Sequence, residues 1–211
     1  MMIKHELIDK LKSSGVLKSF SIEQALLEID RSDFVLPENR GDPYADAALS
    51  IGYGQTISQP FTVVFMLELL DVKQGNKILD VGTGSGWQAS LVAFMSGENG
   101  HTYTVEIIPQ LSAYAKENVS KYPLITDNLS FYEGNARPGL PDVSKELGGF
   151  DRIIAAAEVR EVPEAWKEQL KVGGIMVFPK DNGIYRMVRN SETDFDSLFF
   201  PGFAFVPFVE D

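Results

Sequence analysis

The stretch KILDVGTGSGW, residues 77–87, is the segment that indicates the fold class most clearly. It contains an apolar strand pattern, KILDV, then a glycine loop, GTGSG, and then the start of a helix at Trp87. In open α/β sheets, ligands bind beyond the carboxyl ends of the strands, near the point where the strand order reverses. A binding site is therefore expected at this loop.

Strand and helix patterns alternate after the loop. The expected strands are KILDV (77–81), TYTVEI (102–107), LSFYE (129–133), DRIIAAA (151–157) and GIMVFP (174–179), and the expected helices are WQASLVAFM (87–95), PQLSAYAKENVSKY (109–122) and PEAWKEQL (163–170). Apolar strands that alternate with helices predict an α/β fold whose mostly parallel central sheet has helices on both faces. The segments GIYRMVRN (183–190) and FAFVPFVE (203–210), joined by a polar loop, predict an antiparallel C-terminal edge.

A short helical extension precedes the sheet. The patterns IKHELIDKLKSS (3–14) and SIEQALLEIDRS (21–32) predict two helices, the second with Ser21 as its N-cap. The stretch SIGYGQTISQP (50–60) then combines glycines, which tolerate positive φ near a ligand, with a Ser-Gln-Pro that could cap and open a helix. Taken alone it favours a capped loop. We expect a single domain over 1–211, with N-terminal helices and a substrate loop in 1–60 and the core with its C-terminal strands in 61–211.

The composition excludes several classes of protein. Apolar residues make up 44% of the chain and charged residues 23%, and there is no cysteine for a disulfide, a thiolate metal site or a cysteine nucleophile. A net charge of −11 disfavours nucleic acid as a partner. The longest apolar run, FTVVFMLELL (61–70), contains Glu68 and falls short of the ~20 residues that span a bilayer. The N-terminus lacks a secretory pattern, so a cytoplasmic protein without membrane contact is expected.

The spacing of the glycines discriminates among ligands. A dinucleotide fingerprint needs a third glycine where Trp87 stands, and a phosphate-binding loop needs a lysine after Gly86. The loop is instead flanked by two acids, Asp80 before it and Glu106 at the end of the next strand, 26 residues later. An acid at about this separation can accept the ribose hydroxyls of a nucleoside. Two carboxylates and no phosphate-neutralising lysine suit a positively charged nucleoside, and S-adenosylmethionine is such a ligand.

Two of these interpretations have alternatives. Glu106 alone would be a solvated acid at a strand end, and only its combination with the loop favours ribose binding. Asn135, in the segment EGNARPG that follows a predicted strand, can donate and accept hydrogen bonds at an adenine edge. An ordinary turn asparagine would look the same in the sequence.

Longer motifs resemble one enzyme family, the protein-L-isoaspartate (D-aspartate) O-methyltransferases, along nearly the whole chain. They are SFSIEQALLEIDRSDFV, GYGQTISQPFTVVFMLELL, ILDVGTGSGW, VEIIPQL, FDRIIAAA, VPEAWKEQLKVGG and PGFAFVPF. The resemblance implies a Rossmann-like class I S-adenosylmethionine-dependent methyltransferase fold. It also implies methyl transfer to the free α-carboxylate of an isoaspartyl residue in a damaged protein or peptide, a repair reaction that leaves S-adenosylhomocysteine.

The resemblance also assigns residues. The family's active-site serine falls on Ser58, and the loop of Thr56, Ile57 and Ser58 would close over the methyl donor and the substrate carboxylate. The residues expected to bind the cofactor are Gln59, Asp80, Gly82, Thr83, Gly84, Ser85, Gly86, Glu106, Ile107, Asn135 and Ala136. No metal is expected, and we expect a monomer. A carboxylate is already ionised at neutral pH, so neither His5 nor His101 needs a catalytic role.

Two positions depart from the family pattern. Gly134, Asn135 and Ala136 stand where the family usually has G-D-G, and Glu158 stands in a loop that is usually small and apolar. A carboxylate there would repel an anionic substrate unless it points to solvent or pairs with Arg160, which we favour. Two alternatives stay open: a methyltransferase of this fold with a different acceptor, and a non-catalytic module that binds cofactor or peptide. The intact TISQP beside GTGSG argues against the second.

Overall fold

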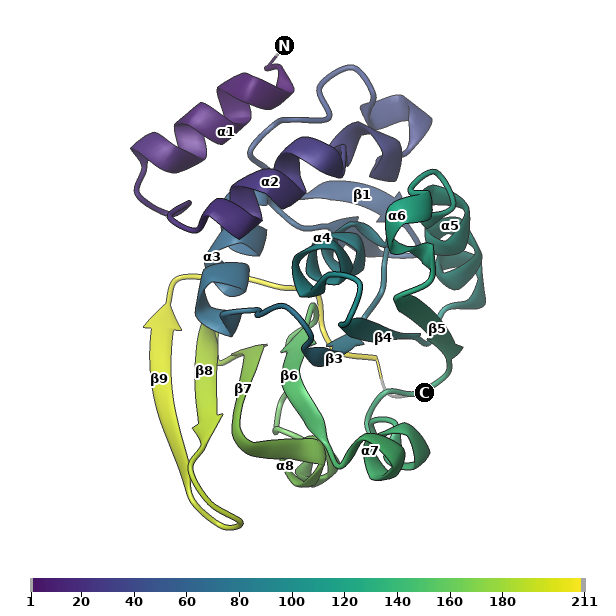
Figure 1. Cartoon of the computed structure of the whole chain (residues 1–211). Coiled ribbons are helices and arrows are strands. Elements are labelled where there is room, and N and C mark those ends of the chain that lie inside the picture. The colour runs from purple at the N-terminus through teal and green to yellow at the C-terminus, as the bar shows by residue number, and fades with distance from the viewer. Residues whose placement is uncertain (1, 210–211) are drawn as a thin grey trace.

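The computed structural model describes residues 2–209, and a seven-stranded sheet in the order β5-β4-β3-β6-β7-β8-β9 forms its centre (Figure 1). The strands are β3 (Lys77–Val81), β4 (His101–Glu106), β5 (Leu129–Glu133), β6 (Phe150–Ala155), β7 (Leu170–Lys180), β8 (Gly183–Arg189) and β9 (Phe195–Pro201). The strands from β5 to β7 pair in parallel, whereas β8 and β9 are antiparallel. The predicted parallel sheet with an antiparallel edge is confirmed.

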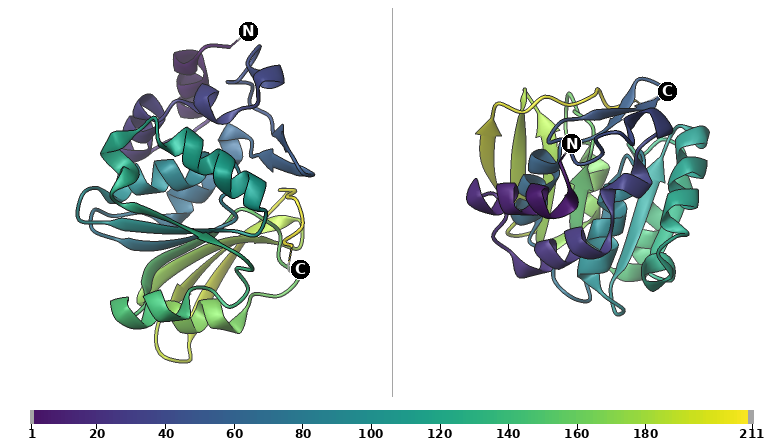
Figure 2. Two further views of the ribbon diagram at one scale, coloured as in Figure 1. Left: turned by 90° about the vertical axis from the view of Figure 1, so that its right-hand side faces the viewer. Right: turned by 90° about the horizontal axis from the view of Figure 1, so that it is seen from above.

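Helices cover both faces of the sheet (Figure 2). They are α1 (Lys4–Ser13), α2 (Phe20–Glu28), α3 (Pro60–Leu70), α4 (Trp87–Ser96), α5 (Pro109–Val119), α6 (Pro123–Thr126), α7 (Pro141–Leu147) and α8 (Glu164–Gln169), with 3₁₀ turns at Arg31–Phe34 and Pro37–Asn39. The helices α3, α4 and α5, with α1 and α2 stacked beyond them, lie on one face, and α7 and α8 lie on the other. Each face buries its own apolar cluster. None of the helices in the described part of the chain is both long and apolar enough to cross a membrane.

The strand order places the site. From the central β3 the chain moves outward to β4 and β5, and it then returns to the other side of β3 as β6. At such a reversal the loops that follow neighbouring strands lead away from each other and leave a crevice outside the carboxyl ends of the strands. The carboxyl ends of β3, β4 and β6, at Val81, Glu106 and Ala155, therefore lie side by side at one edge of the sheet.

The stretch 50–60 contains an element that the sequence analysis did not predict. Strands β1 (Leu49–Gly52) and β2 (Gln55–Ile57) form a hairpin, whose turn at Tyr53 and Gly54 takes positive φ values of 54° and 71°. Helix α3 begins at Pro60, as the proline indicated, but the side chains of Ser58 and Gln59 do not cap it. The cap comes from Asp46, whose Oδ1 accepts a hydrogen bond from the Phe61 backbone at 3.0 Å.

Two predicted elements differ in the structure. The final strand is not FAFVPFVE: β9 comes from the segment 195–201, which had been taken for a polar loop, and residues 203–209 form an extended segment with one bridge between Glu158 and Pro207. Phe203 and Phe208 of that segment pack against aromatic rings of α3 and α8, and Glu210 lies outside the described residues. Ser21 is not an N-cap either, because α2 already begins at Phe20.

Candidate active site

The glycine loop after β3 adopts a conformation that requires glycine. Gly82, Gly84 and Gly86 have φ values of 88°, 54° and 89°, a region that other residues rarely adopt. A Cβ on Gly86 would lie 3.2 Å from the Ala115 side chain, so this glycine also lets α5 pack closely. The loop is therefore held with its backbone at the carboxyl edge of the sheet, where Gly82 and Gly84 line a pocket.

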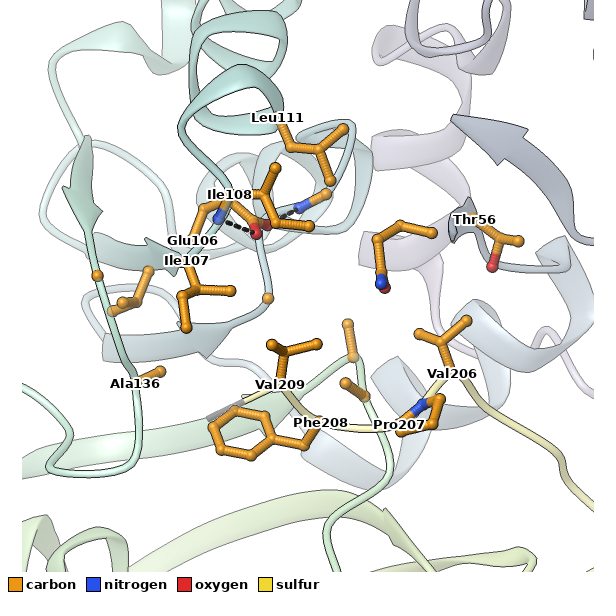
Figure 3. A pocket seen from close by; sticks show the side chains of 17 residues that line it. Thr56, Glu106, Ile107, Ile108, Leu111, Ala136, Val206, Pro207, Phe208 and Val209 are labelled. Atoms are coloured by element: carbon orange, nitrogen blue, oxygen red, sulfur yellow. Dashed lines mark hydrogen bonds between the residues drawn. The ribbon is translucent and has the colours of Figure 1, made fainter. Parts of the chain in front are cut away.

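Glu106 forms one wall of this pocket (Figure 3). It is only 6% exposed, and its carboxylate accepts hydrogen bonds from the Gly84 backbone at 2.8 Å and the Ile108 backbone at 3.0 Å. These two bonds fix the carboxylate between the glycine loop and the start of α5. Each carboxylate oxygen has a further lone pair that a ligand hydroxyl could use.

The rest of this pocket, which we call the cofactor pocket, is mostly apolar, with Gln55 and Thr56 as its other polar side chains. Opposite Glu106 and Leu111, the C-terminal residues Val206, Pro207, Phe208 and Val209 close the pocket (Figure 3). The remaining lining residues come from strand β2, from the end of β4 and from the loops after β3, β4, β5 and β6: they are Gln55, Thr56, Gly82, Gly84, Val105, Ile107, Ile108, Gly134, Ala136, Ala156 and Ala157. One buried acid above an apolar slot suits a flat, weakly polar ring attached to a hydroxylated sugar.

A second cavity of about 640 Å³, the acceptor cavity, lies beside the first. Ser58 and Gln59 line it together with aromatic side chains of α3 and of the C-terminal segment; the full lining is Ala48, Thr56, Ser58, Gln59, Phe61, Thr62, Ala156, Pro201, Gly202, Phe203, Ala204, Phe205 and Val206. Thr56, Ala156 and Val206 line both spaces. The two pockets therefore meet at these three residues.

Arg31 fixes the segment that carries Ser58. Its guanidinium is buried and donates to the carbonyl oxygens of Pro43 at 2.9 Å, Ala47 at 3.2 Å and Ser58 at 2.9 Å. It also stacks 4.6 Å from the centre of the Trp87 ring. Burial lowers the pKa of Arg31 to about 9, although the nearby Asp46 carboxylate opposes the shift.

Asp80 lies beneath the glycine loop rather than in the pocket. It is fully buried, and its carboxylate accepts hydrogen bonds from Gln88 at 2.8 Å and from the Thr104 hydroxyl at 2.7 Å. The hydroxyls of Thr104 and Thr83 lie 2.6 Å apart. Burial raises the pKa of Asp80 to about 6, against the opposing effect of these hydrogen bonds.

The structure brings most of the sequence-predicted site residues together. Thr56, Gly82, Gly84, Glu106, Ile107 and Ala136 line the cofactor pocket, Thr56, Ser58 and Gln59 line the acceptor cavity, and Ile57, Thr83 and Ser85 line a smaller hollow under the loop that also reaches Ser58. Asp80, Gly86 and Asn135 line none of the three. The exposed Asn135 accepts a hydrogen bond from the Arg137 backbone at 2.8 Å, so its oxygen builds the turn beside the pocket.

Glu158 does not line any of these spaces. Its carboxylate accepts a hydrogen bond from the Asn182 backbone at 3.0 Å, in the turn between β7 and β8. The sequence analysis expected this acid to point to solvent or to pair with Arg160, whereas it is half-buried and its carboxylate binds a backbone N–H.

The sequence analysis missed the pocket residues that come from the C-terminal segment, Val206 to Val209, and from the loop after β6, Ala156 and Ala157. The motifs PGFAFVPF and FDRIIAAA contain most of these residues, so the signal was present but was interpreted as strands. Among residues 2–209, no three histidine, aspartate or glutamate side chains gather in a way that would hold a metal ion.

Comparisons with known proteins show the family of this chain. The sequence model of the protein-L-isoaspartate(D-aspartate) O-methyltransferase family matches residues 2–211. A protein-L-isoaspartate O-methyltransferase of Ignicoccus hospitalis is 38% identical over 99% of this chain and 98% of its own length, and one of Thermococcus onnurineus is 36% identical over 96% and 91%.

A solved structure is similar along the whole chain. It is a putative protein-L-isoaspartate O-methyltransferase from Plasmodium falciparum in complex with S-adenosyl-L-homocysteine, with a TM-score of 0.87 and 25% identity over 100% of both chains. Together with the family match, these likenesses identify its class: the chain belongs to the protein-L-isoaspartate (D-aspartate) O-methyltransferase family.

Proposed function

We propose that this protein transfers the methyl group of S-adenosylmethionine to the free α-carboxylate of isoaspartyl residues in damaged proteins or peptides. The observation that supports this most directly is the contact between the cofactor pocket and the acceptor cavity at Thr56, Ala156 and Val206. A donor and an acceptor bound in the two spaces would meet there without solvent between them.

The residues of the cofactor pocket fit S-adenosylmethionine. We assign ribose binding to Glu106 and contact with the adenine ring to Ile107 and Ala136. Gly82, Thr83, Gly84, Ser85 and Gly86 would shape the loop that faces the methionine part, and Gln59 would approach it from the start of α3. We assign indirect roles to Asp80, which supports the loop from below, and to Asn135, which orders the turn before Ala136.

The acceptor chemistry needs few groups from the protein. When bound, S-adenosylmethionine supplies an activated methyl group on its sulfonium. A carboxylate oxygen attacks that carbon, the C–S bond breaks and its electron pair stays on sulfur, so the products are a methyl ester and S-adenosylhomocysteine. The acceptor is already ionised at neutral pH, so no base is required. The resulting ester can close to a succinimide and reopen as normal aspartate.

We assign orientation of the acceptor carboxylate to the segment Thr56, Ile57 and Ser58. The Ser58 hydroxyl can donate a hydrogen bond to a carboxylate, and Arg31 holds the Ser58 carbonyl in place at 2.9 Å. Positioning a nucleophile about 3 Å from the reacting carbon is enough to supply much of the rate of such a displacement.

A pair of peptides tests the proposal. The two peptides have the same sequence and differ only in one residue, isoaspartate or aspartate, and methyl transfer is followed with labelled cofactor. We expect labelling of the isoaspartyl peptide alone, because the side-chain carboxylate of normal aspartate is displaced from the in-line geometry. Equal labelling of both would indicate a different acceptor, and labelling of neither, despite cofactor binding, would indicate a non-catalytic module.

The proposal extends to the state of the protein: a single domain that acts as a monomer in the cytoplasm. The single seven-stranded sheet with helices on both of its faces supports the single domain. Light scattering should give the mass of one chain, and unfolding followed by two independent probes should give one coincident transition.

A further inference from the structure

Glu158 connects three segments that are far apart in the sequence. Its backbone N–H donates to the Val206 carbonyl at 2.8 Å, and its carbonyl accepts from the Phe208 N–H at 2.8 Å. Its side chain accepts from the Asn182 N–H at 3.0 Å. Glu158 thus joins the loop after β6, the turn between β7 and β8, and the C-terminal segment.

Asn182 completes the connection. Its carbonyl oxygen accepts hydrogen bonds from Gly202 at 3.0 Å and Phe203 at 3.2 Å, at the beginning of the same C-terminal segment. Asp181 and Asn182 both have φ of 55°, which is the left-handed geometry of a tight two-residue hairpin turn. Glu158 therefore holds the segment 202–208 directly at its end and, through the Asn182 turn, at its beginning.

The held segment forms part of the wall of each pocket. Gly202 to Val206 line the acceptor cavity, and Val206 to Val209 line the cofactor pocket. Ring contacts fix its two ends on different helices: Phe203 stacks on Phe65 of α3 at 5.0 Å, and Phe208 meets Trp166 of α8 edge-on at 5.8 Å. A shift of this segment would change the width of both spaces at once.

We propose that Glu158 is a positioning residue for methyl transfer: its carboxylate locks the turn at Asn182, and so sets where the segment 202–208 lies along the cofactor pocket and the acceptor cavity. This inference rests on the proposed function. In this role the carboxylate acts through the length of its side chain, which brings an acceptor oxygen to the Asn182 N–H. Its charge does not select the substrate.

Three substitutions separate the effect of side-chain length at Glu158 from the effect of its charge. Glu158→Gln keeps the length and one acceptor oxygen but removes the charge. Glu158→Asp keeps the charge but shortens the side chain by one methylene, and Glu158→Ala removes both. Glu161→Ala is the matched control, because Glu161 is an exposed acid of the same loop.

Hydrogen exchange and steady-state kinetics are the two measurements. We expect the amides of Gly202 and Phe203 to exchange roughly tenfold faster in Glu158→Ala and Glu158→Asp, and the KM for an isoaspartyl peptide to rise by a similar factor, about the effect of one lost hydrogen bond. Glu158→Gln and Glu161→Ala should match the wild type in both measurements.

Either of two results would overturn the inference. Unchanged exchange at Gly202 and Phe203 in Glu158→Ala would show that the side chain does not hold the segment. A change of peptide KM in Glu158→Gln, with normal exchange, would show that the charge acts on the acceptor. Exchange needs no turnover, so an inactive wild type would contradict the proposed function while leaving this measurement intact.

Discussion

Among single residues, Glu106 combines burial with two fixed hydrogen bonds and a position on the pocket wall. Its substitution by alanine should weaken binding of S-adenosylmethionine by roughly 1.5 to 3 kcal/mol, the range for a hydrogen bond to a charged group. Titration calorimetry measures the loss directly. Glu133→Gln is the control. Glu133, on β5, is the register partner of Glu106 on β4, but it is exposed and its carboxylate binds Lys116. Equal affinities in wild type and Glu106→Ala would remove Glu106 from the site.

Ser58 differs from Glu106 because it lines the acceptor cavity and not the cofactor pocket. Ser58→Ala should lower the rate of methyl transfer by about 10- to 1,000-fold, or about 1.4 to 4 kcal/mol, since the carboxylate loses one orienting donor. Cofactor affinity should change much less. Single-turnover transfer and calorimetry on the same variant test both statements, with Ser50→Ala in β1 as the control. Full activity would assign the orientation to backbone donors alone, and a methylated Ser58 in the wild type would overturn direct transfer.

Asp80 makes the stability of the fold depend on pH. Its pKa in the folded protein, about 6, lies above the ordinary value of 3.8, so the folded state binds this proton more tightly than the unfolded state. The contribution is fully present below pH 4 and is lost as the pH rises through about 6. Asp80→Asn has no such loss. We therefore compare the free energy of unfolding in urea of Asp80→Asn with that of the wild type. The difference, variant minus wild type, should become more positive by roughly 2 to 3 kcal/mol between pH 4 and pH 7. A difference that stays constant with pH would contradict this account.

At the level of elements, the site depends on how the segments before the hairpin β1–β2 and before α3 are attached to the 3₁₀ turn Arg31–Phe34. Arg31 makes this attachment through three loop carbonyls. Arg31→Lys should lower the unfolding free energy by roughly 1 to 3 kcal/mol, because one ammonium on a flexible stem cannot satisfy three fixed acceptors. The KM for an isoaspartyl peptide should rise more than the Kd for S-adenosylhomocysteine. Arg40→Lys, at an exposed arginine of the same region, should change neither value.

The elements that were predicted correctly carry their signal locally. The bounds of β3 and β5 match the sequence patterns, and α4 starts at Trp87 directly after the glycine loop, because an apolar run followed by glycines leaves few alternatives. The hairpin β1–β2 was missed because its strands of four and three residues are too short for an alternating pattern. The 3₁₀ turns and the short α6 and α7 were missed for the same reason.

In the molecule as a whole, what the sequence could not predict is contact between distant segments. The glycine loop and Glu106 were placed together because strand order follows from the alternation of strands and helices. No local pattern indicates that Glu158 binds residues 206 and 208, or that Arg31 binds the carbonyl of Ser58. The segment 203–209 was therefore predicted to be a strand, and its place in the pocket wall was missed. Most of its residues nevertheless belong to the family motif PGFAFVPF.

Net charge is the property of the whole molecule that substrate choice should reflect. The chain carries a charge of −11, whereas no charged side chain is among the residues that line the acceptor cavity. Any preference between basic and acidic peptides must therefore arise from the long-range field, which salt screens over ~30 Å at 0.01 M and ~3 Å at 1 M. We expect an isoaspartyl peptide flanked by lysines to exceed its glutamate-flanked counterpart in kcat/KM by roughly tenfold at low salt. The two values should converge at high salt, with a neutral peptide between them throughout. A ratio that salt does not change would place the discrimination in direct contacts instead.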